Sequence, residues 1–357
     1  MEEPIKNKIN INEGVRVQEV HTCLLCNSKG ILLYQDLRDR LFNALGNWSL
    51  IRCQECGLVW LNPQPIPENI GKLYANYFTH SIDIKNPILA SLRKKVWRIL
   101  LATTFGYNNI LNSSSSKSKW IGKALSLVPL LKERVESSIM YLNGSWKGKL
   151  LDIGCGNGQF LATMRDLGWE IQGIEPDKQA ARFARDRFGI QVIASTLEEA
   201  KIPNESFDAI ILRHVIEHVS DAIRFLEKCH RILKPTGKLV ILTPNIESMA
   251  HRIFKESWRD LDPPRHFYLF SLFTLRICAE RAGFQIEILV TTAQSAKWVW
   301  LRSKIIQNKG TYSKIDITKM MKMKGVAFQF LEAMTRNLWK NIGEELLLIA
   351  SKKQKIA

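Results

Sequence analysis

The segment 149–175, KLLDIGCGNGQFLATMRDLGWEIQGIE, constrains the fold of this chain more than any other part of the sequence. An apolar run at 150–153 is typical of a buried parallel strand, and it ends in the turn Gly154-Cys-Gly156-Asn-Gly158. A helical pattern of apolar residues follows, and a second strand at 170–174 closes on Glu175. The segment therefore predicts one β-α-β unit with glycines after its first strand and an acid at the tip of its second.

This arrangement suits the capture of a nucleotide. Glycines let the backbone approach a ligand closely, and a helix N-terminus begins at the same turn. Glu175, 17 residues after Gly158, can accept hydrogen bonds from both hydroxyls of a ribose. The dinucleotide fingerprint is G-x-G-x-x-G, whereas this turn reads G-x-G-x-G followed by Gln159, so a pyrophosphate cradle is not the best fit. A turn that only joins strand to helix is the simpler alternative.

With Asp152 before the first glycine, the stretch resembles motif I of the class I S-adenosylmethionine (SAM)-dependent methyltransferases, and Glu175 resembles their ribose-binding acid. The strings 206–212, SFDAIIL, and 231–241, RILKPTGKLVI, are similar to the same family. The resemblance implies an α/β fold, a Rossmann-like sheet of about seven strands with helices on both faces.

The same resemblance implies a SAM site. Relatives place an acid after the third strand, but this chain has Ser195 and Thr196 there, so we expect backbone near Leu197 to contact the adenine. The expected cofactor-binding residues are Asp152, Gly154, Cys155, Gly156, Asn157, Gly158, Glu175, Pro176, Leu197 and Arg213.

Four cysteines near the start of the chain predict a metal site. They form two C-x-x-C pairs, Cys23 with Cys26 and Cys53 with Cys56, separated by 26 residues. Thiolates paired in this way suit a tetrahedral zinc ion, which would be structural because no coordination position is left open. Four buried thiols without metal are the alternative.

The continuation RCQECGLVWLNPQP, residues 52–65, resembles the zinc module of a bacterial and archaeal methyltransferase group associated with surface sugars and polysaccharides. The resemblance covers roughly 21–77. A zinc ribbon can also bind nucleic acid, and the basic composition would support that, but residues 21–66 carry no basic stripe with interleaved aromatics.

The net charge of +17 is concentrated in two places. Residues 78–147 carry eleven Lys or Arg against three acids, and residues 297–343 carry ten against two. We predict basic helices at 87–101 and 120–142, joined by an Asn/Ser-rich loop at 108–118. Basic amphipathic helices either present a solvated face or dock on anionic membranes, and we expect both stretches to share one face.

These segments define the predicted organisation. We expect a flexible lead-in at 1–20, the ribbon at 21–77, a connector at 78–147 and a methyltransferase domain at 148–352. Residues 293–341 interrupt that domain before its last strand, either as a lid over an apolar or lipid-linked acceptor or as a helical pair covering the sheet edge. No run of about 18 apolar residues and no signal-peptide pattern is present, so we expect a cytoplasmic protein, or one peripheral to the inner face of the membrane.

Catalytic candidates follow the fourth predicted strand. His214, Glu217 and His218 fit the metallopeptidase pattern H-x-x-E-H, but their place after a nucleotide-binding unit argues against zinc hydrolysis. The methyltransferase resemblance instead puts V-x-E-H beside the methyl group, so His218 is the expected general base and Glu217 its partner. The alternatives are that His218 only braces the next helix, or that no base is needed.

Residues 246–268 are the expected acceptor loop because they concentrate aromatics, charges and prolines. His214 is the second candidate base after His218, and His266 of this loop is the alternative base. Arg259 or Arg265 could hold an anionic acceptor. A packed aromatic loop is the alternative.

The sequence thus predicts methyl transfer from SAM to a small-molecule acceptor, a sugar hydroxyl or carbon of cell-surface glycan synthesis. Nucleic-acid methylation, with the ribbon and basic insertions on the phosphate backbone, is one alternative. A non-catalytic SAM-binding scaffold is the other.

Overall fold

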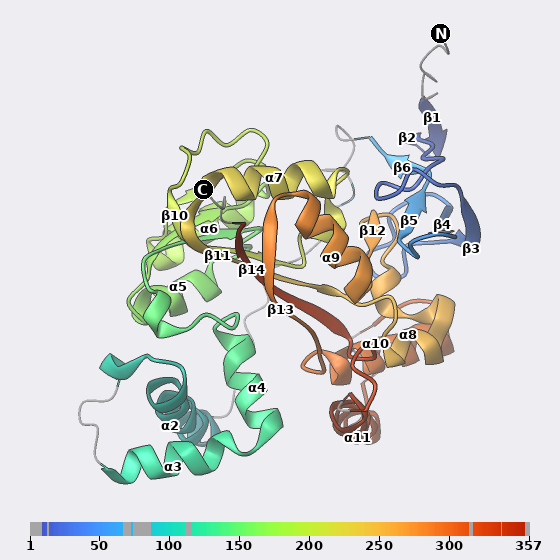
Figure 1. Ribbon diagram of the computed structural model, residues 1–357. Helices are drawn as coiled ribbons and strands as arrows, with labels where there is room; N and C mark the ends of the chain where they lie inside the picture. The colour runs from blue at the N-terminus through green and yellow to red at the C-terminus, as the bar shows by residue number, and fades with distance from the viewer. Residues whose placement is uncertain are drawn as a thin grey trace. The chain divides into compact units, whose positions relative to one another are not determined.

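The computed structural model describes residues 9–12, 14–66, 73, 87–110, 116–313, 317–336 and 338–353. The chain divides into two compact units (Figure 1). Unit 1 comprises residues 1–77, 214–226 and 241–348, and unit 2 comprises residues 78–213, 227–240 and 349–357.

A seven-stranded sheet with the order β13-β14-β11-β10-β7-β8-β9 is the central element of the fold. β7 pairs in parallel with β8 and with β10, and β8 pairs in parallel with β9. The predicted α/β sheet of about seven strands is therefore confirmed. Its strands are β7 (Lys149–Ile153), β8 (Glu170–Ile174), β9 (Val192–Ile193), β10 (Phe207–Arg213), β11 (Leu233–Pro244), β13 (Phe284–Thr292) and β14 (Glu345–Lys352).

Helices connect these strands, and one of them, α8, lies within 246–268, which the composition predicts to be a loop. Asp177 begins α6 because its side chain accepts hydrogen bonds from the N–H groups of Gln179 and Ala180, at 2.8 and 3.3 Å. Ser271 and Thr274 form a capping box at the start of α9. The helices are α5 (Gln159–Asp166), α6 (Lys178–Phe188), α7 (Ala222–Ile232), α8 (Met249–Phe254) and α9 (Leu272–Arg281), with short 3-10 turns η3 (Ile216–His218), η4 (Lys255–Ser257) and η5 (Arg259–Leu261).

In the connector, the single helix predicted at 120–142 is wrong. Two helices are present, α3 (Ser116–Ser126) and α4 (Pro129–Ser138), because Pro129 lacks the N–H that would continue α3 and instead opens α4. α2 (Pro87–Thr104) extends three residues beyond its prediction, and α3 lies beside it in Figure 1. The remaining turns are η1 (Asn108–Ile110) and η2 (Gly144–Trp146); residues 111–115 of the predicted loop lie outside the described residues.

The segment Lys234–Gly237, within the string 231–241 that resembles the methyltransferase family, belongs to β11. Lys234 Nζ donates to both carboxylate oxygens of Asp208 in β10, at 3.0 and 2.8 Å.

The ribbon in unit 1 contributes strands to two small sheets. β3 (Gly30–Leu37), β4 (Trp48–Cys53) and β5 (Val59–Asn62) form a sheet that β12 (Tyr268–Leu269) completes, as Figure 1 shows. A second sheet joins β1 (Ile9–Asn12), β2 (Val15–Gln18) and β6 (Gln64–Pro65). The expected flexible lead-in thus contains two strands, β1 paired with β2 and β2 paired with β6.

The insertion before β14 is a pair of helices, α10 (Ala296–Lys309) and α11 (Lys319–Thr335). They lie side by side in Figure 1, and a Cβ atom at Gly325 of α11 would come within 3.1 Å of the Lys297 carbonyl of α10. The insertion is therefore helical. Among the described residues, no helix is long and apolar enough to cross a membrane.

Arg265 joins the ribbon to the segment that precedes β12. Its guanidinium donates to both oxygens of Asp39, each at 2.8 Å, and also pairs with Asp262; Arg265 and Asp39 are 1% and 5% exposed. Burial opposes the charged guanidinium, but the two carboxylates outweigh burial and raise the Arg265 pKa above its usual range. The charge expected to hold an acceptor at Arg265 is therefore already neutralised inside the protein.

Replacing Asp39 with Ala should lower the free energy of unfolding by about 3 kcal/mol, because the change leaves a buried guanidinium short of one partner. Urea denaturation followed by circular dichroism measures the effect. The matched control is Glu280→Ala, which removes the exposed i,i+4 pair of Glu280 with Arg276 and should cost less than about 1 kcal/mol. Equal losses for the two variants would contradict the importance of the buried pair.

Candidate functional site

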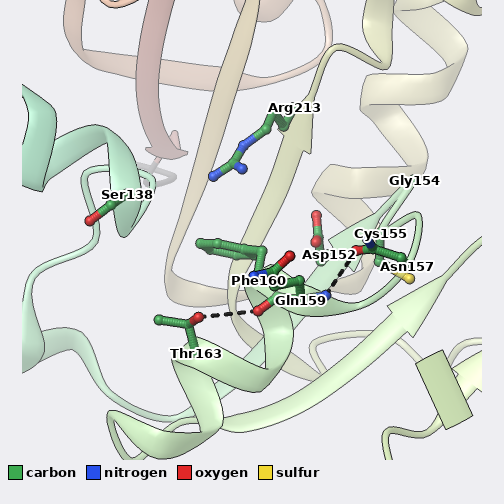
Figure 2. A pocket seen from close by; sticks show the side chains of 9 residues that line it. All are labelled: Ser138, Asp152, Gly154, Cys155, Asn157, Gln159, Phe160, Thr163 and Arg213. Atoms are coloured by element: carbon green, nitrogen blue, oxygen red, sulfur yellow. Dashed lines mark hydrogen bonds between the residues drawn. The ribbon is translucent and has the colours of Figure 1, made fainter. Parts of the chain in front are cut away.

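Unit 2 contains a cavity of about 340 Å³ at the carboxyl end of β7 (Figure 2). Ligand pockets typically measure roughly 300 to 1,000 Å³, so a nucleoside-sized ligand is within range. The residues that line it are Ser138, Asp152, Gly154, Cys155, Asn157, Gln159, Phe160, Thr163 and Arg213.

The glycine turn shapes one wall of this cavity. Gly154, Gly156 and Gly158 all have positive φ, at 74°, 54° and 74°, which residues with side chains rarely adopt. A Cβ atom at Gly158 would lie 2.7 Å from the Ala184 Cβ, so a side chain there would push α6 away. No atom lies within 4 Å of the Cβ position at Gly156, which leaves this point of the turn open to a ligand.

Glu175 holds the turn from the tip of β8. One carboxylate oxygen accepts the Gly156 N–H at 2.8 Å, and the other accepts the Asp177 N–H at 3.0 Å. The N–H groups of Gly154 and Cys155 donate to the Ile174 carbonyl, at 2.8 and 3.1 Å. A carboxylate offers about four acceptor positions, so Glu175 retains capacity for hydroxyl donors while it anchors the turn.

Asp152 and Arg213 place opposite charges on the cavity. Asp152 is 5% exposed, and burial raises its pKa to about 7, although the positive charge of Arg213 opposes that shift. The Arg213 guanidinium lies 4.7 Å from the centre of the Phe160 ring, and its Nε donates to the Met140 sulfur at 3.0 Å. Figure 2 shows Arg213 pointing from β10 toward the cavity. A cationic ligand would favour the ionised form of Asp152.

Five of the ten predicted cofactor-binding residues line the cavity: Asp152, Gly154, Cys155, Asn157 and Arg213. Gly156, Gly158 and Glu175 shape the turn, and Pro176 follows it as an exposed residue. Leu197 is 5% exposed and does not line the cavity. Four further residues line the cavity and were not predicted from the sequence. Gln159, Phe160 and Thr163 lie in the first turns of α5, and their place directly after the glycine turn could have indicated them. Ser138 belongs to α4, and the sequence gives no signal for it.

The other candidate residues lie in unit 1. Glu217 is fully buried, and its carboxylate accepts from Thr243 Oγ1 at 2.9 Å and lies 3.3 Å from His214 Nδ1. The other ring nitrogen of His214 lies 3.0 Å from Glu345. Burial opposes the imidazolium of His214, but the two carboxylates outweigh burial and raise its pKa. His214 is thus an ion-pair partner of Glu217 and a poor proton acceptor.

The environment of His218 favours its neutral form, whereas that of His214 favours the imidazolium. Its Nδ1 lies 2.9 Å from the Arg265 carbonyl, which can only accept, so Nδ1 carries the proton and the lone pair of the neutral ring lies on Nε2. Burial, assisted by the neighbouring His266, lowers the His218 pKa to about 4. His218 is therefore neutral, and capable of accepting a proton, throughout the physiological range.

His266 lies next to His218, with the ring centroids 4.7 Å apart. Its Nδ1 donates to the Asp260 carbonyl at 2.7 Å, and its Nε2 lies 3.8 Å from Asp262. The structure therefore brings together the three predicted catalytic residues, Glu217, His218 and His266. Among the described residues they also form one of two groups that could hold a metal ion. His214 is not in that group, which argues against the H-x-x-E-H peptidase reading.

The loop 246–268 is buried to a greater extent than its composition suggested. Trp258, Arg265 and His266 are 2%, 1% and 3% exposed, and Trp258 Nε1 donates to Glu344 at 3.3 Å. Arg259 forms an ion pair with its neighbour Asp260. Residues 258–268 of this loop are thus mostly buried, whereas Arg252, Ile253, Lys255 and Glu256 are exposed.

The four cysteines of the ribbon form the second possible metal group. The Cys23 and Cys56 sulfurs lie 3.4 Å apart, Cys26 and Cys53 3.3 Å, and Cys26 and Cys56 3.8 Å. Zinc–sulfur bonds of about 2.3 Å in a tetrahedron place sulfurs about 3.8 Å apart, so the donor set fits zinc. None of these cysteines is in a disulfide.

Protein purified without chelators should contain about one zinc per chain by mass spectrometry, and Cys26→Ser should lose it because a three-thiolate site binds far more weakly. Cys229→Ala, which removes a buried thiol of α7 outside this group, is the control and should keep the metal. Bound iron, or no metal in the unmodified protein, would rule out the zinc assignment.

Comparison with known proteins shows that part of this chain is similar to methyltransferases. Residues 128–288 match the sequence model of a family described as a methyltransferase domain. The chain is similar to a ubiquinone biosynthesis O-methyltransferase of Rhodopseudomonas palustris, 36% identical over 118 residues, covering 32% of this chain and 45% of that protein. The mitochondrial mouse protein of the same name is 33% identical over 171 residues, covering 43% and 46%. This chain thus spans less than half the length of these curated relatives.

Among solved structures, a SAM-dependent methyltransferase from Archaeoglobus fulgidus aligns with a TM-score of 0.43 and 23% identity. The alignment covers 62% of this chain and 93% of that one.

Proposed function

We propose that this protein transfers a methyl group from SAM to a hydroxyl of a small molecule. The observation that carries the proposal is the cavity beside the glycine turn, which Glu175 anchors at the tip of β8. The match of residues 128–288 to a methyltransferase domain supports the same reaction class. SAM supplies an electrophilic methyl group on a sulfonium, and the residues of the chain bind, orient and deprotonate.

In this proposal the cavity residues hold the cofactor. The ribose hydroxyls would donate to Glu175. The nucleoside could lie close to the backbone at Gly156, because no other atom occupies that position. The carboxylate of Asp152 would stabilise the cationic end of the cofactor, since burial raises its pKa to about 7 even beside Arg213 and a further positive charge favours the ionised form.

His218 is the proposed general base. The Arg265 carbonyl fixes its tautomer, so that Nε2 can accept the proton of the acceptor hydroxyl while the methyl group is transferred. Glu217 is a positioning residue held by Thr243 and His214, and His266 packs edge-on against the base.

The identity of the acceptor is the finer part of the proposal. The relatives named above are O-methyltransferases, which favours oxygen over carbon as the accepting atom. Their names refer to ubiquinone biosynthesis, so the sugar-type acceptor rests only on the resemblance of residues 52–65 to zinc modules of glycan-associated methyltransferases. Both acceptor classes present a hydroxyl to the same base.

Glu175→Gln should weaken binding of S-adenosylhomocysteine by about tenfold or more, because a charge-assisted hydrogen bond contributes about 1.5 to 3 kcal/mol. Calorimetric titration measures the affinity, and thermal unfolding checks that the variant folds. Glu170→Gln, at the other end of β8 with its side chain 71% exposed, is the matched control and should bind normally. Unchanged affinity in Glu175→Gln would remove the cofactor site from this cavity.

His218→Gln should lower kcat by about a hundredfold, the usual contribution of a general base, and leave S-adenosylhomocysteine affinity unchanged. The His218 pKa of about 4 lies below the ordinary histidine value, so the neutral form persists above pH 4 and the base is lost only as pH falls through that value. With SAM saturating, so that its positive charge keeps Asp152 ionised in this proposal, kcat/KM of the unmodified protein for the acceptor should therefore not decline as pH falls from 7.5 to about 5.5.

His230→Gln on α7 is the control and should retain full activity. A decline of kcat/KM centred near the ordinary histidine pKa, or full activity of His218→Gln, would exclude this base.

A further inference from the structure

α11 has two apolar faces, of which only one is covered. Phe328 and Glu332 face the interior; Phe328 lies 6.4 Å, ring to ring, from Trp300 of α10, and Glu332 accepts the Glu344 N–H at 3.0 Å. These contacts fix the rotation of the helix about its axis.

The opposite face of α11 carries large apolar side chains that are exposed. At about 100° per residue, Met320, Met323, Phe330, Leu331 and Met334 fall on one stripe. The apolar surface continues into the residues after the helix and onto α10. Its members, which we call the α11 face, are Met320, Met323, Val326, Phe330, Leu331, Met334, Leu338, Trp339 and Trp298, between 47% and 77% exposed.

Lysines flank this stripe. On the same helical projection, Lys319 and Lys322 lie on one side of the stripe and Lys324 on the other, and all three are exposed. Residues 297–343 contain ten Lys or Arg and two acids. One acid, Glu332, is buried, and the other, Asp316, lies outside the described residues. Among the described residues, no exposed carboxylate of this segment offsets the lysines.

We propose that the α11 face docks on the surface of an anionic lipid bilayer. Aromatic, leucine and methionine side chains would enter the boundary between headgroups and acyl chains, while the flanking lysines contact anionic headgroups. Two other partners fit this face less well. A second copy of the α11 face would bring lysines of like charge together. A nucleic acid would leave the apolar stripe exposed to water. The inference goes beyond the proposed function and does not depend on it.

Flotation with phospholipid vesicles, without SAM or acceptor, tests the docking. The full-length protein should float with phosphatidylcholine vesicles that contain phosphatidylglycerol, should bind pure phosphatidylcholine far more weakly, and should bind less as salt is raised. The double variant Phe330→Gln, Leu331→Gln should lose at least about tenfold in partitioning, because two apolar side chains no longer leave water.

Phe273→Gln is the matched control, because Phe273 on α9 is 57% exposed and Phe330 is 54% exposed. It should change partitioning by less than about twofold, as surface substitutions outside an interface do. Lys322→Glu with Lys324→Glu should weaken binding to the anionic vesicles by about tenfold or more and leave binding to neutral vesicles unchanged.

Three results would overturn the proposal. The first is equal binding to neutral and anionic vesicles. The second is unchanged flotation of the Phe330, Leu331 double variant. The third is absence of vesicle binding together with a dimer, detected by sedimentation, that the same double variant abolishes.

Discussion

The buried ion pair of Arg265 with Asp39 ties the ribbon of unit 1 to the segment before β12. Asp39 belongs to the ribbon, whereas Arg265 precedes β12, so the pair joins segments more than two hundred residues apart in sequence. The segment that it fixes then extends the ribbon sheet, with the Leu61 N–H donating to the Phe267 carbonyl at 2.9 Å. The Phe267 N–H donates to the Glu217 carbonyl at 2.7 Å. One charged contact thus supports both the ribbon and the turn that carries His218.

This contact gives the four-cysteine ribbon a role beyond local stability. The carbonyl that sets the His218 tautomer belongs to Arg265 itself, and the guanidinium of the same residue is held by a ribbon carboxylate. The proposed base is therefore oriented, through one residue, by the module with the four cysteines. The cavity in unit 2 needs no such long-range support, because consecutive elements of one β-α-β unit supply most of its lining residues.

The difference between long-range and local contacts explains which features could be predicted from the sequence. The glycine turn, Glu175, the Asp177 cap and the paired cysteines were predictable because each depends on spacing within a short stretch. The burial of Arg265 was not predictable, since its partner Asp39 lies in another segment and charged residues in a Pro-rich stretch usually indicate an exposed loop. The strands at 9–12 and 15–18 escaped prediction for the same reason, because β6 completes their sheet from residues 64–65. The break at Pro129 was a local signal that the apolar periodicity concealed.

The most direct test of the central claim follows the methyl group itself. Purified protein would be incubated with SAM labelled in its methyl group and with fractions of a cell extract, and S-adenosylhomocysteine and labelled products would be measured by mass spectrometry. The proposed function predicts one S-adenosylhomocysteine per label incorporated, with the label in small molecules as an O-methyl ether. Incorporation confined to RNA or DNA, or no S-adenosylhomocysteine with any fraction although the cofactor binds, would contradict it.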